Sequence, residues 1–246
     1  MKASDYIAQF IAQQGVSHIF GYIGGMITHL VDSIDKKPNV QFIQTYHEQT
    51  AAIAAEGYAL ESGKFGVAIC TSGPGVTNMM TGIADAFFGN IPVIFISGQV
   101  NTYEYKYDKP IRQQGFQEME VVNVVKPITK YAVLLDKAED IRYELEKALH
   151  IATTGRKGPV VIDLPMNISR AEINPDNLRS FIPEPETVKT FDVQQVVSLL
   201  ESAKRPMLLL GGGAIGADKQ IADFIAKSQM PVVTSLMGRG TTDETY

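Results

Sequence analysis

Residues 65–98, FGVAICTSGPGVTNMMTGIADAFFGNIPVIFISG, contain a complete strand–helix–strand unit. The apolar runs FGVAICT and IPVIFISG at its two ends have the length and composition of buried strands, and GVTNMMTGIADAFFG between them is long enough for a helix. Two strands joined by a helix run parallel, because the helix carries the chain back to the same end of the sheet. This stretch therefore predicts a parallel α/β fold.

The same alternation continues on both sides of this unit. A first helix begins with Ser4 or Asp5 as its cap and stops at Gly15. The further predicted elements are a strand over 16–22, a helix over 24–34, a buried strand over 40–45, a helix over 48–61, a helix over 138–153 and a last strand over 158–165. We expect a parallel sheet flanked by helices on both faces, in a domain of residues 1–166.

Residues 167–190 break the pattern, because three prolines and many polar residues are typical of a surface linker. Residues 191–246 resume it with two helix–strand units, which begin a second, Rossmann-like domain. Two such units are too few to cover both faces of a parallel sheet. We therefore expect this second domain to be incomplete and the sequence to be part of a longer protein.

Composition narrows the classes of protein that fit. Of 246 residues, 45% are hydrophobic and 20% charged, which is ordinary for a globular protein. The net charge of −5 and the lack of a basic cluster argue against a nucleic-acid partner. Residues 1–15 lack the apolar core of a signal peptide, and no apolar run is long enough to span a membrane. A single cysteine, Cys70, fits a reducing compartment, so we predict a cytoplasmic protein without a disulfide.

Two glycine-rich loops follow predicted strands. In CTSGPGVTN, residues 70–78, the glycines allow a sharp turn, and amides at the following helix start can attract an anion. A tight strand-to-helix connection explains the same residues. Gly211, Gly213 and Gly216 have the G-x-G-x-x-G spacing of a dinucleotide site, but the acid expected about 20 residues later is missing. A structural turn is the better interpretation of this second loop.

His47 and Glu48 stand between a predicted strand and an alanine-rich helix. Ligands of open α/β sheets bind at such strand-to-helix junctions, which makes Glu48 a candidate functional residue. An acid in the first turn of a helix can also serve only to complement the helix dipole. The four histidines show no metal-ligand spacing, so we expect no metal site in these residues.

Taken together, several motifs resemble one enzyme family. IFGYIGG, HEQTAAIAAEGYA, TSGPGVTN, ADAFFGNIPVIFISGQV, GFQEME and GRKGPVVIDLP occur in the order found in thiamine diphosphate-dependent enzymes, and the sequence is most similar to acetolactate synthases. The resemblance is dense over residues 1–166. From PMLLLGGGAIGA to PVVTSLMGRG the sequence resembles the start of that family's central domain.

The resemblance implies a role for Glu48. In these enzymes the acid at this position bonds a ring nitrogen of the cofactor's aminopyrimidine and favours the imino tautomer, which deprotonates the thiazolium carbon to the reactive ylide. That role requires a carboxyl group held away from water. The resemblance also implies that Gly25 lies near the cofactor, that Pro74 and Asn78 border the pyrimidine, and that Gln99, Phe116 and Gln117 line the substrate pocket.

The resemblance further implies a homodimer or homotetramer with the cofactor between subunits. It assigns Mg²⁺ to a C-terminal domain outside this sequence, so the fragment alone is expected to be inactive. FAD binding by the central domain stays open.

Differences from usual acetolactate synthases fall near the pocket mouth, at Ile23, Met26 and residues 101–114, and Met166 replaces a lysine. The predicted reaction is decarboxylation and ligation of pyruvate or a related 2-oxo acid. A 2-oxo acid decarboxylase or aldehyde lyase is the alternative, and a noncatalytic nucleotide-binding or interaction protein is the alternative from another class.

Overall fold

The computed structural model describes residues 1–185 and 190–242. The chain forms two compact units, Met1–Pro183 and Glu184–Tyr246, and each is described by itself below. The first unit contains the predicted strand-to-helix junctions and all of the candidate site residues.

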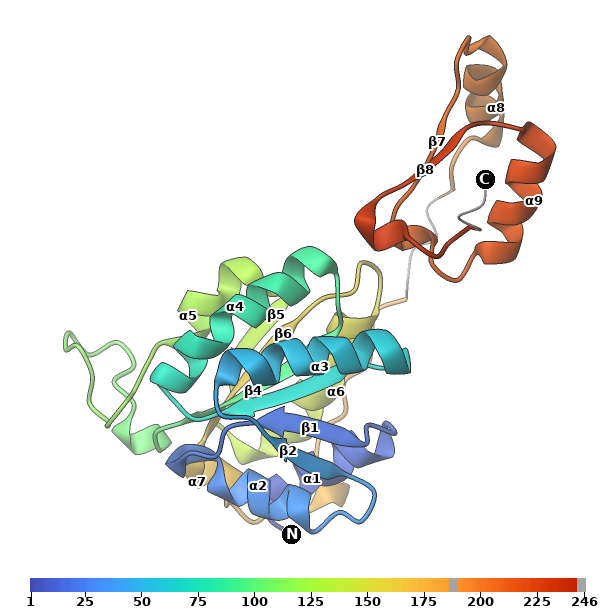
Figure 1. Cartoon of the computed structure of the whole chain (residues 1–246). Coiled ribbons are helices and arrows are strands. Elements are labelled where there is room, and N and C mark those ends of the chain that lie inside the picture. Colours follow the sequence, from blue (N-terminus) through green and yellow to red (C-terminus); the bar gives the residue numbers. More distant parts are fainter. Residues whose placement is uncertain (186–189, 243–246) are drawn as a thin grey trace. The chain divides into compact units, whose positions relative to one another are not determined.

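A six-stranded parallel sheet forms the centre of the first unit (Figure 1), in the order β2-β1-β3-β4-β6-β5. Its strands are β1 (His18–Gly21), β2 (Gln41–Gln44), β3 (Gly66–Cys70), β4 (Val93–Gln99), β5 (Tyr131–Leu134) and β6 (Val160–Pro165). Its helices are α1 (Ala3–Gln13), α2 (Thr28–Asp35), α3 (Glu48–Ser62), α4 (Pro74–Gly89), α5 (Val121–Val125), α6 (Ile141–Thr153) and α7 (Met166–Ser169). The predicted parallel α/β fold is confirmed.

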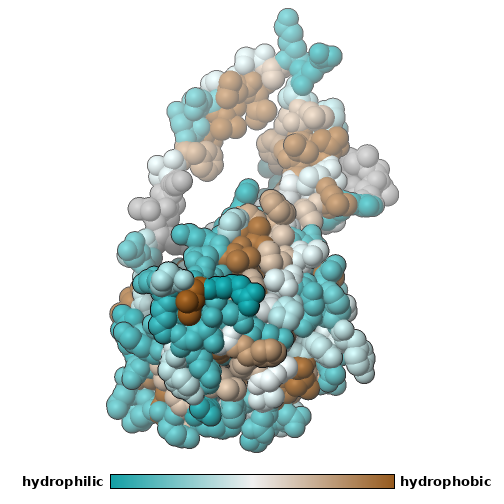
Figure 2. Space-filling model, turned by 90° about the vertical axis from the view of Figure 1, so that its left-hand side faces the viewer, coloured by the Kyte–Doolittle hydropathy of each residue, from teal (hydrophilic) through white to brown (hydrophobic). Residues whose placement is uncertain are grey.

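Each face of the sheet has its own hydrophobic core. Successive side chains of a strand point to opposite faces, so in β3 Val67 and Ile69 join the core under α1, α2 and α6, whereas Ala68 joins the core under α3 and α4. The central strands β3 and β4 are buried along their whole length. Figure 2 accordingly shows hydrophilic residues over much of the first unit on the side that faces the viewer, with hydrophobic residues in smaller patches.

Three local predictions differ from the structure. The strand over 40–45 was expected to be buried, but β2 is an edge strand whose Gln41 and Gln44 are exposed. The opposite edge strand, β5, was not predicted from the sequence at all. Helix α1 begins at Ala3 rather than after a Ser4 or Asp5 cap, and both of those side chains instead bind the Ser33 hydroxyl.

Residues 166–183 pack on the first unit. Leu178 is buried in the core under α1 and α6, Lys2 forms a β-bridge with Glu172, and the Phe181 amide donates to Glu146. The compact unit therefore continues beyond the expected boundary at residue 166. Residues 186–189 of the expected linker lie outside the described residues.

The second unit contains α8 (Val193–Ser202), β7 (Leu208–Leu210), α9 (Asp218–Ser228) and β8 (Val232–Thr234). Its two strands pair in parallel, as the sequence predicts. The glycine-rich loop follows β7, and Gly216 there has a φ of 91°, a conformation that favours glycine. No helix among the described residues is long and apolar enough to cross a bilayer, and the cytoplasmic location stays a prediction.

Helix α3 lies unusually close to its neighbours. Its buried alanines Ala51, Ala52, Ala55 and Ala59 face β3 and α4. A Cβ on Gly66 of β3 would stand 2.1 Å from the Ala55 carbonyl oxygen, and a Cβ on Gly82 of α4 would stand 2.3 Å from the Ala52 methyl carbon. Only glycine at these two positions allows this spacing, which sets where the start of α3 lies.

We predict that Gly82→Ala destabilises the first unit by about 2 kcal/mol, because the added methyl group overpacks the contact with Ala52. Gly57→Ala is the matched control: it also replaces a glycine inside a helix, but nothing lies within 4 Å of its new Cβ. That control should gain about 0.5–1 kcal/mol from helix propensity. Denaturant unfolding followed by circular dichroism measures both, and equal effects of the two substitutions would contradict the close helix contact.

Candidate active site at the carboxyl edge of the sheet

The carboxyl ends of β1, β3 and β4 bring three loops together at one edge of the sheet. A Cβ on Gly24, after β1, would stand 2.4 Å from the Thr71 side chain after β3. A Cβ on Gly98, near the end of β4, would stand 2.7 Å from the Ile27 side chain. The exposed Gly25 follows directly in the first of these loops. These close approaches place the segments that contain the predicted site residues side by side.

Glu48 is the first residue of α3 and is only 5% exposed. The ring of His47 caps the helix, because its Nδ1 accepts a hydrogen bond from the Gln49 amide at 3.1 Å. Oε2 of Glu48 accepts a hydrogen bond from Nδ2 of Asn78 at 2.9 Å. The helix start favours a negative charge at this position. The sequence prediction of a carboxyl group held largely away from water therefore agrees with the geometry.

The second oxygen of Glu48, Oε1, has no hydrogen-bond partner within residues 1–185 and 190–242. It lies 3.4 Å from the point where a Cβ on Gly75 would stand, so glycine keeps the space beside the carboxyl group open. Pro74 is exposed at the start of α4, one helical turn before Asn78. Glu48 thus has one carboxyl oxygen bound to Asn78 and an unbound oxygen beside Gly75.

Residues 115–119 lie against the TSGPG loop, at Gly73. Gln117 has a φ of 59°, and its carbonyl oxygen lies 2.7 Å from where a Cβ on Gly73 would stand, so the two backbones touch. The neighbouring Phe116 is 74% exposed. Gln117, with Phe116 beside it in the sequence, therefore lies next to the TSGPG loop, and their place in a substrate pocket stays a prediction.

Gln99 has a different position from the other predicted pocket residues. It is completely buried at the end of β4, and its side chain bonds Asp163, the Met119 carbonyl and the Val100 amide. In this structure its contribution to a pocket is indirect, through residues 115–119. Sequence analysis missed Asp163, although an acid inside the apolar strand VVIDLP is a signal that could have identified it.

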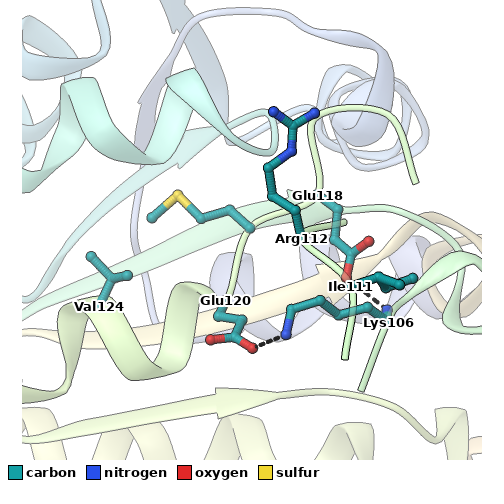
Figure 3. Close-up of a pocket in the computed structure, with 7 residues that line it drawn as sticks. Lys106, Ile111, Arg112, Glu118, Glu120 and Val124 are labelled. Carbon is teal, nitrogen blue, oxygen red and sulfur yellow. Dashed lines mark hydrogen bonds and ion pairs between the residues drawn. The ribbon is translucent and has the colours of Figure 1, made fainter. Parts of the chain in front are cut away.

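A separate pocket of about 410 Å³ lies within the loop that follows β4. Figure 3 shows Lys106, Ile111, Arg112, Glu118, Glu120 and Val124 around it, and Met119 also lines it. Lys106 pairs with Glu120 at 2.5 Å, while Glu118 accepts from three backbone amides of the loop. Neither Glu48 nor Asn78 lines this pocket, so it is separate from the Glu48 site.

Two further groups near the site are buried and titratable. Burial, with a contribution from the carboxyl group of Asp85, raises the pKa of Glu56 on α3 to about 8. Oε1 of Glu56 is buried without a hydrogen-bond partner among the described residues. Burial also raises the pKa of the Cys70 thiol well above its usual value, which makes it an unreactive core residue. Within the described part of the chain no cluster of acids, histidines or cysteines could hold a metal ion.

Comparison with known proteins connects this geometry to a family. The family described as thiamine pyrophosphate enzyme, N-terminal TPP binding domain, matches residues 1–124, half of the chain. The chain belongs to the thiamine pyrophosphate enzyme family. Residues 193–246 match the central domain of the same family. The glycine-rich loop after β7 is therefore part of a thiamine pyrophosphate enzyme's central domain.

Three relatives of this chain, each named as an acetolactate synthase large subunit, illustrate the similarity. The large subunit from Buchnera aphidicola (subsp. Schizaphis graminum) is 38% identical over 98% of this chain and 42% of its own length. The large subunit from Lactococcus lactis is 39% identical over 98% of this chain and 42% of its own length. The isozyme 3 large subunit from Escherichia coli is 34% identical over 100% of this chain and 43% of its own length. The chain thus spans about two fifths of the length of these relatives.

The raised pKa of Glu56 predicts a pH dependence of stability. Folded Glu56 keeps a proton up to about pH 8, whereas an unfolded glutamate releases it near its usual value of 4.5. The free energy of unfolding therefore decreases as the pH rises from 4.5 to 8. Glu56→Gln removes this charge and should stabilise the protein at pH 8 by on the order of 1 kcal/mol, with little effect at pH 4.5.

Denaturant unfolding at both pH values measures this difference. The control is Glu61→Gln, at the exposed end of the same helix, which should leave the pH dependence unchanged. If Glu56→Gln and the unsubstituted protein lose stability equally between the two pH values, Glu56 does not hold its proton in the folded state.

Proposed function

We propose that this chain supplies the N-terminal and part of the central domain of a thiamine diphosphate-dependent enzyme that acts on pyruvate or a related 2-oxo acid, with an activity like that of acetolactate synthase. The observation that carries the proposal is Glu48, a buried carboxyl group with one oxygen bound to Asn78 and the other beside Gly75. The names of the relatives support the reaction class.

The residues present fit the pyrimidine side of the cofactor. Glu48 would hold the ring through its unengaged oxygen, Asn78 and Pro74 would border the ring, and Gly25 would lie near it. Gly75 leaves room that any side chain would reduce. Thiamine diphosphate, when bound, supplies the nucleophilic carbon and the electron sink that decarboxylation and ligation of 2-oxo acids need.

Glu48 itself has the task of holding a proton at a ring nitrogen. Its low exposure keeps water from competing for the carboxyl group, and the Asn78 amide fixes which oxygen is available. A positioned acid–base group of this kind contributes on the order of 10²–10⁴ to the rate. Phe116 and Gln117 would then contact the substrate. Gln99 would hold their segment in place through its hydrogen bond to the Met119 carbonyl.

Further parts of the proposal follow the family resemblance. Mg²⁺ and the diphosphate group would be held by residues outside this chain, so the isolated chain is expected to be inactive. The cofactor would lie between two subunits of a homodimer or homotetramer. FAD binding by the central domain is a separate proposal that flavin analysis of the purified full-length protein tests.

Product analysis distinguishes the two candidate reactions. The full-length protein is incubated with pyruvate, thiamine diphosphate and Mg²⁺. Acetolactate as the product supports the synthase activity, whereas acetaldehyde supports a decarboxylase. A protein that neither binds thiamine diphosphate nor consumes any 2-oxo acid contradicts the proposed function.

We predict that Glu48→Gln lowers turnover by on the order of 10²-fold or more, because the amide cannot exchange a proton with the ring. The fold should remain, since glutamine can still accept the hydrogen bond from Asn78. The measurements are steady-state turnover, hydrogen–deuterium exchange at the thiazolium carbon of the bound cofactor, and circular dichroism. Glu61→Gln on the same helix is the control with unchanged activity, and a Glu48→Gln variant with normal proton exchange would refute the assigned role.

A further inference from the structure

A buried carboxyl group lies on β6, in the same sheet whose carboxyl edge holds the candidate site. Asp163 of β6 has no exposed surface and stands between the apolar Ile162 and Leu164. Its Oδ1 accepts a hydrogen bond from the hydroxyl of Ser97, its register partner on β4, at 2.7 Å. Its Oδ2 accepts a hydrogen bond from Nε2 of Gln99 at 2.8 Å. A charged or polar group buried this deeply is costly, so its partners indicate what it stabilises.

Gln99 connects Asp163 to the segment that contains Phe116 and Gln117. Its Nε2 also donates to the Met119 carbonyl at 2.8 Å, and its Oε1 accepts from the Val100 amide at 3.0 Å. Both hydrogens of the amide group are therefore used, one toward Asp163 and one toward the segment that follows Gln117. The acceptors Asp163 and Met119 and the Val100 N–H donor together define which end of the Gln99 amide faces Met119.

Two of the contacts that hold the segment 115–119 lie close to the exposed Phe116. At one point the Gln117 carbonyl touches the backbone near Gly73, where any side chain would clash. At the other, the Met119 carbonyl receives the Gln99 hydrogen bond. Phe116 is adjacent to these two holds and is 74% exposed at the site. Loss of the Gln99 contact would remove the hydrogen bond that ties this segment to the end of β4.

We propose that Asp163 is a positioning residue that acts through Gln99 to fix Phe116 and Gln117 beside the Glu48 site. It thereby controls the binding of the 2-oxo acid rather than the proton exchange of the cofactor. This inference rests on the proposed function and deepens it. It also gives Gln99 a supporting role in place of direct contact with the substrate.

The test uses the full-length protein with thiamine diphosphate, Mg²⁺ and pyruvate. In Asp163→Asn a neutral amide of the same shape replaces the carboxyl group, so the hydrogen bond from Gln99 loses its charged acceptor and the link to Met119 is weakened. The KM for pyruvate should rise about tenfold, as expected when reacting groups are misplaced by a fraction of an ångström. The Kd of thiamine diphosphate and the proton exchange at its thiazolium carbon should stay unchanged, in contrast to Glu48→Gln.

Ser97→Ala is the matched control. It removes the other hydrogen bond to the same carboxyl group and leaves the Gln99 bond in place. It should lower thermal stability without changing the KM. An equal rise in KM for Ser97→Ala and Asp163→Asn would show that general loss of packing, and not the Gln99 link, is responsible.

A double substitution provides the rescue. In Gln99→Glu with Asp163→Asn, the carboxyl group moves to position 99. Its protonated form can donate to the Met119 carbonyl, accept from the new amide at position 163 and accept from the Val100 amide. Each single substitution should raise the KM, and the double variant should return it to within about threefold of the unsubstituted value, since the two sites are coupled. A double variant no better than the singles overturns the proposal.

Amide hydrogen exchange separates this inference from the proposed function. Peptides that cover residues 115–119 should exchange faster in Asp163→Asn and in Gln99→Glu, and at the original rate in the double variant. This readout requires no turnover, so it tests the positioning role even if the unsubstituted protein does not use a 2-oxo acid. An unchanged exchange rate in Asp163→Asn refutes the inference, whereas a missing turnover of the unsubstituted protein refutes the proposed function.

Discussion

The close contact of α3 with β3 and α4 is the constraint on which the site depends. Ala55 meets Gly66 of the sheet, and Ala52 meets Gly82 of the neighbouring helix, at distances that no larger residue allows. This contact fixes the first turn of α3 and with it the carboxyl group of Glu48. The hydrogen bond from Asn78 forms on the same side of the helix pair, one turn before Gly82. Packing of these alanines and glycines thus places Asn78 and Glu48 within hydrogen-bond distance of each other.

The parallel direction of the strands then brings the other site loops to the same edge of the sheet. All six strands of the first unit end at the same edge, so loops from distant parts of the sequence meet there. The loop after β1 touches Thr71 through Gly24, and the segment around Gln117 touches Gly73. Gly24 lets its loop lie against the Thr71 side chain, Gly73 lets its loop lie against the Gln117 backbone, and Gly75 puts no side chain beside Glu48.

The three buried acids of the first unit differ in their hydrogen-bond partners. Glu48 is shielded but has one oxygen available, whereas Asp163 uses both oxygens to bind Ser97 and Gln99. Burial raises the pKa of Asp163 to about 7, and the two hydrogen bonds oppose that rise. Glu56 is buried beside Asp85 without such donors among the described residues, which explains its pKa of about 8. The hydrogen-bond partners of these three acids are set by residues that the fold brings next to them, and not by their neighbours in the sequence.

The sequence by itself determined the parallel α/β class and most helix and strand positions, and it made Glu48 a candidate functional residue. Apolar periodicity and strand-to-helix junctions are local signals, so residues 65–98 could be interpreted without a structure. The tertiary structure alone decided that β2 lies at an edge, that β5 exists and that Gln99 is buried against Asp163. Edge position and side-chain partners arise from residues far apart in the sequence: Ser97 and Gln99 meet Asp163 across 64 or more positions. No local pattern contains that pairing, because it depends on the order in which the strands assemble.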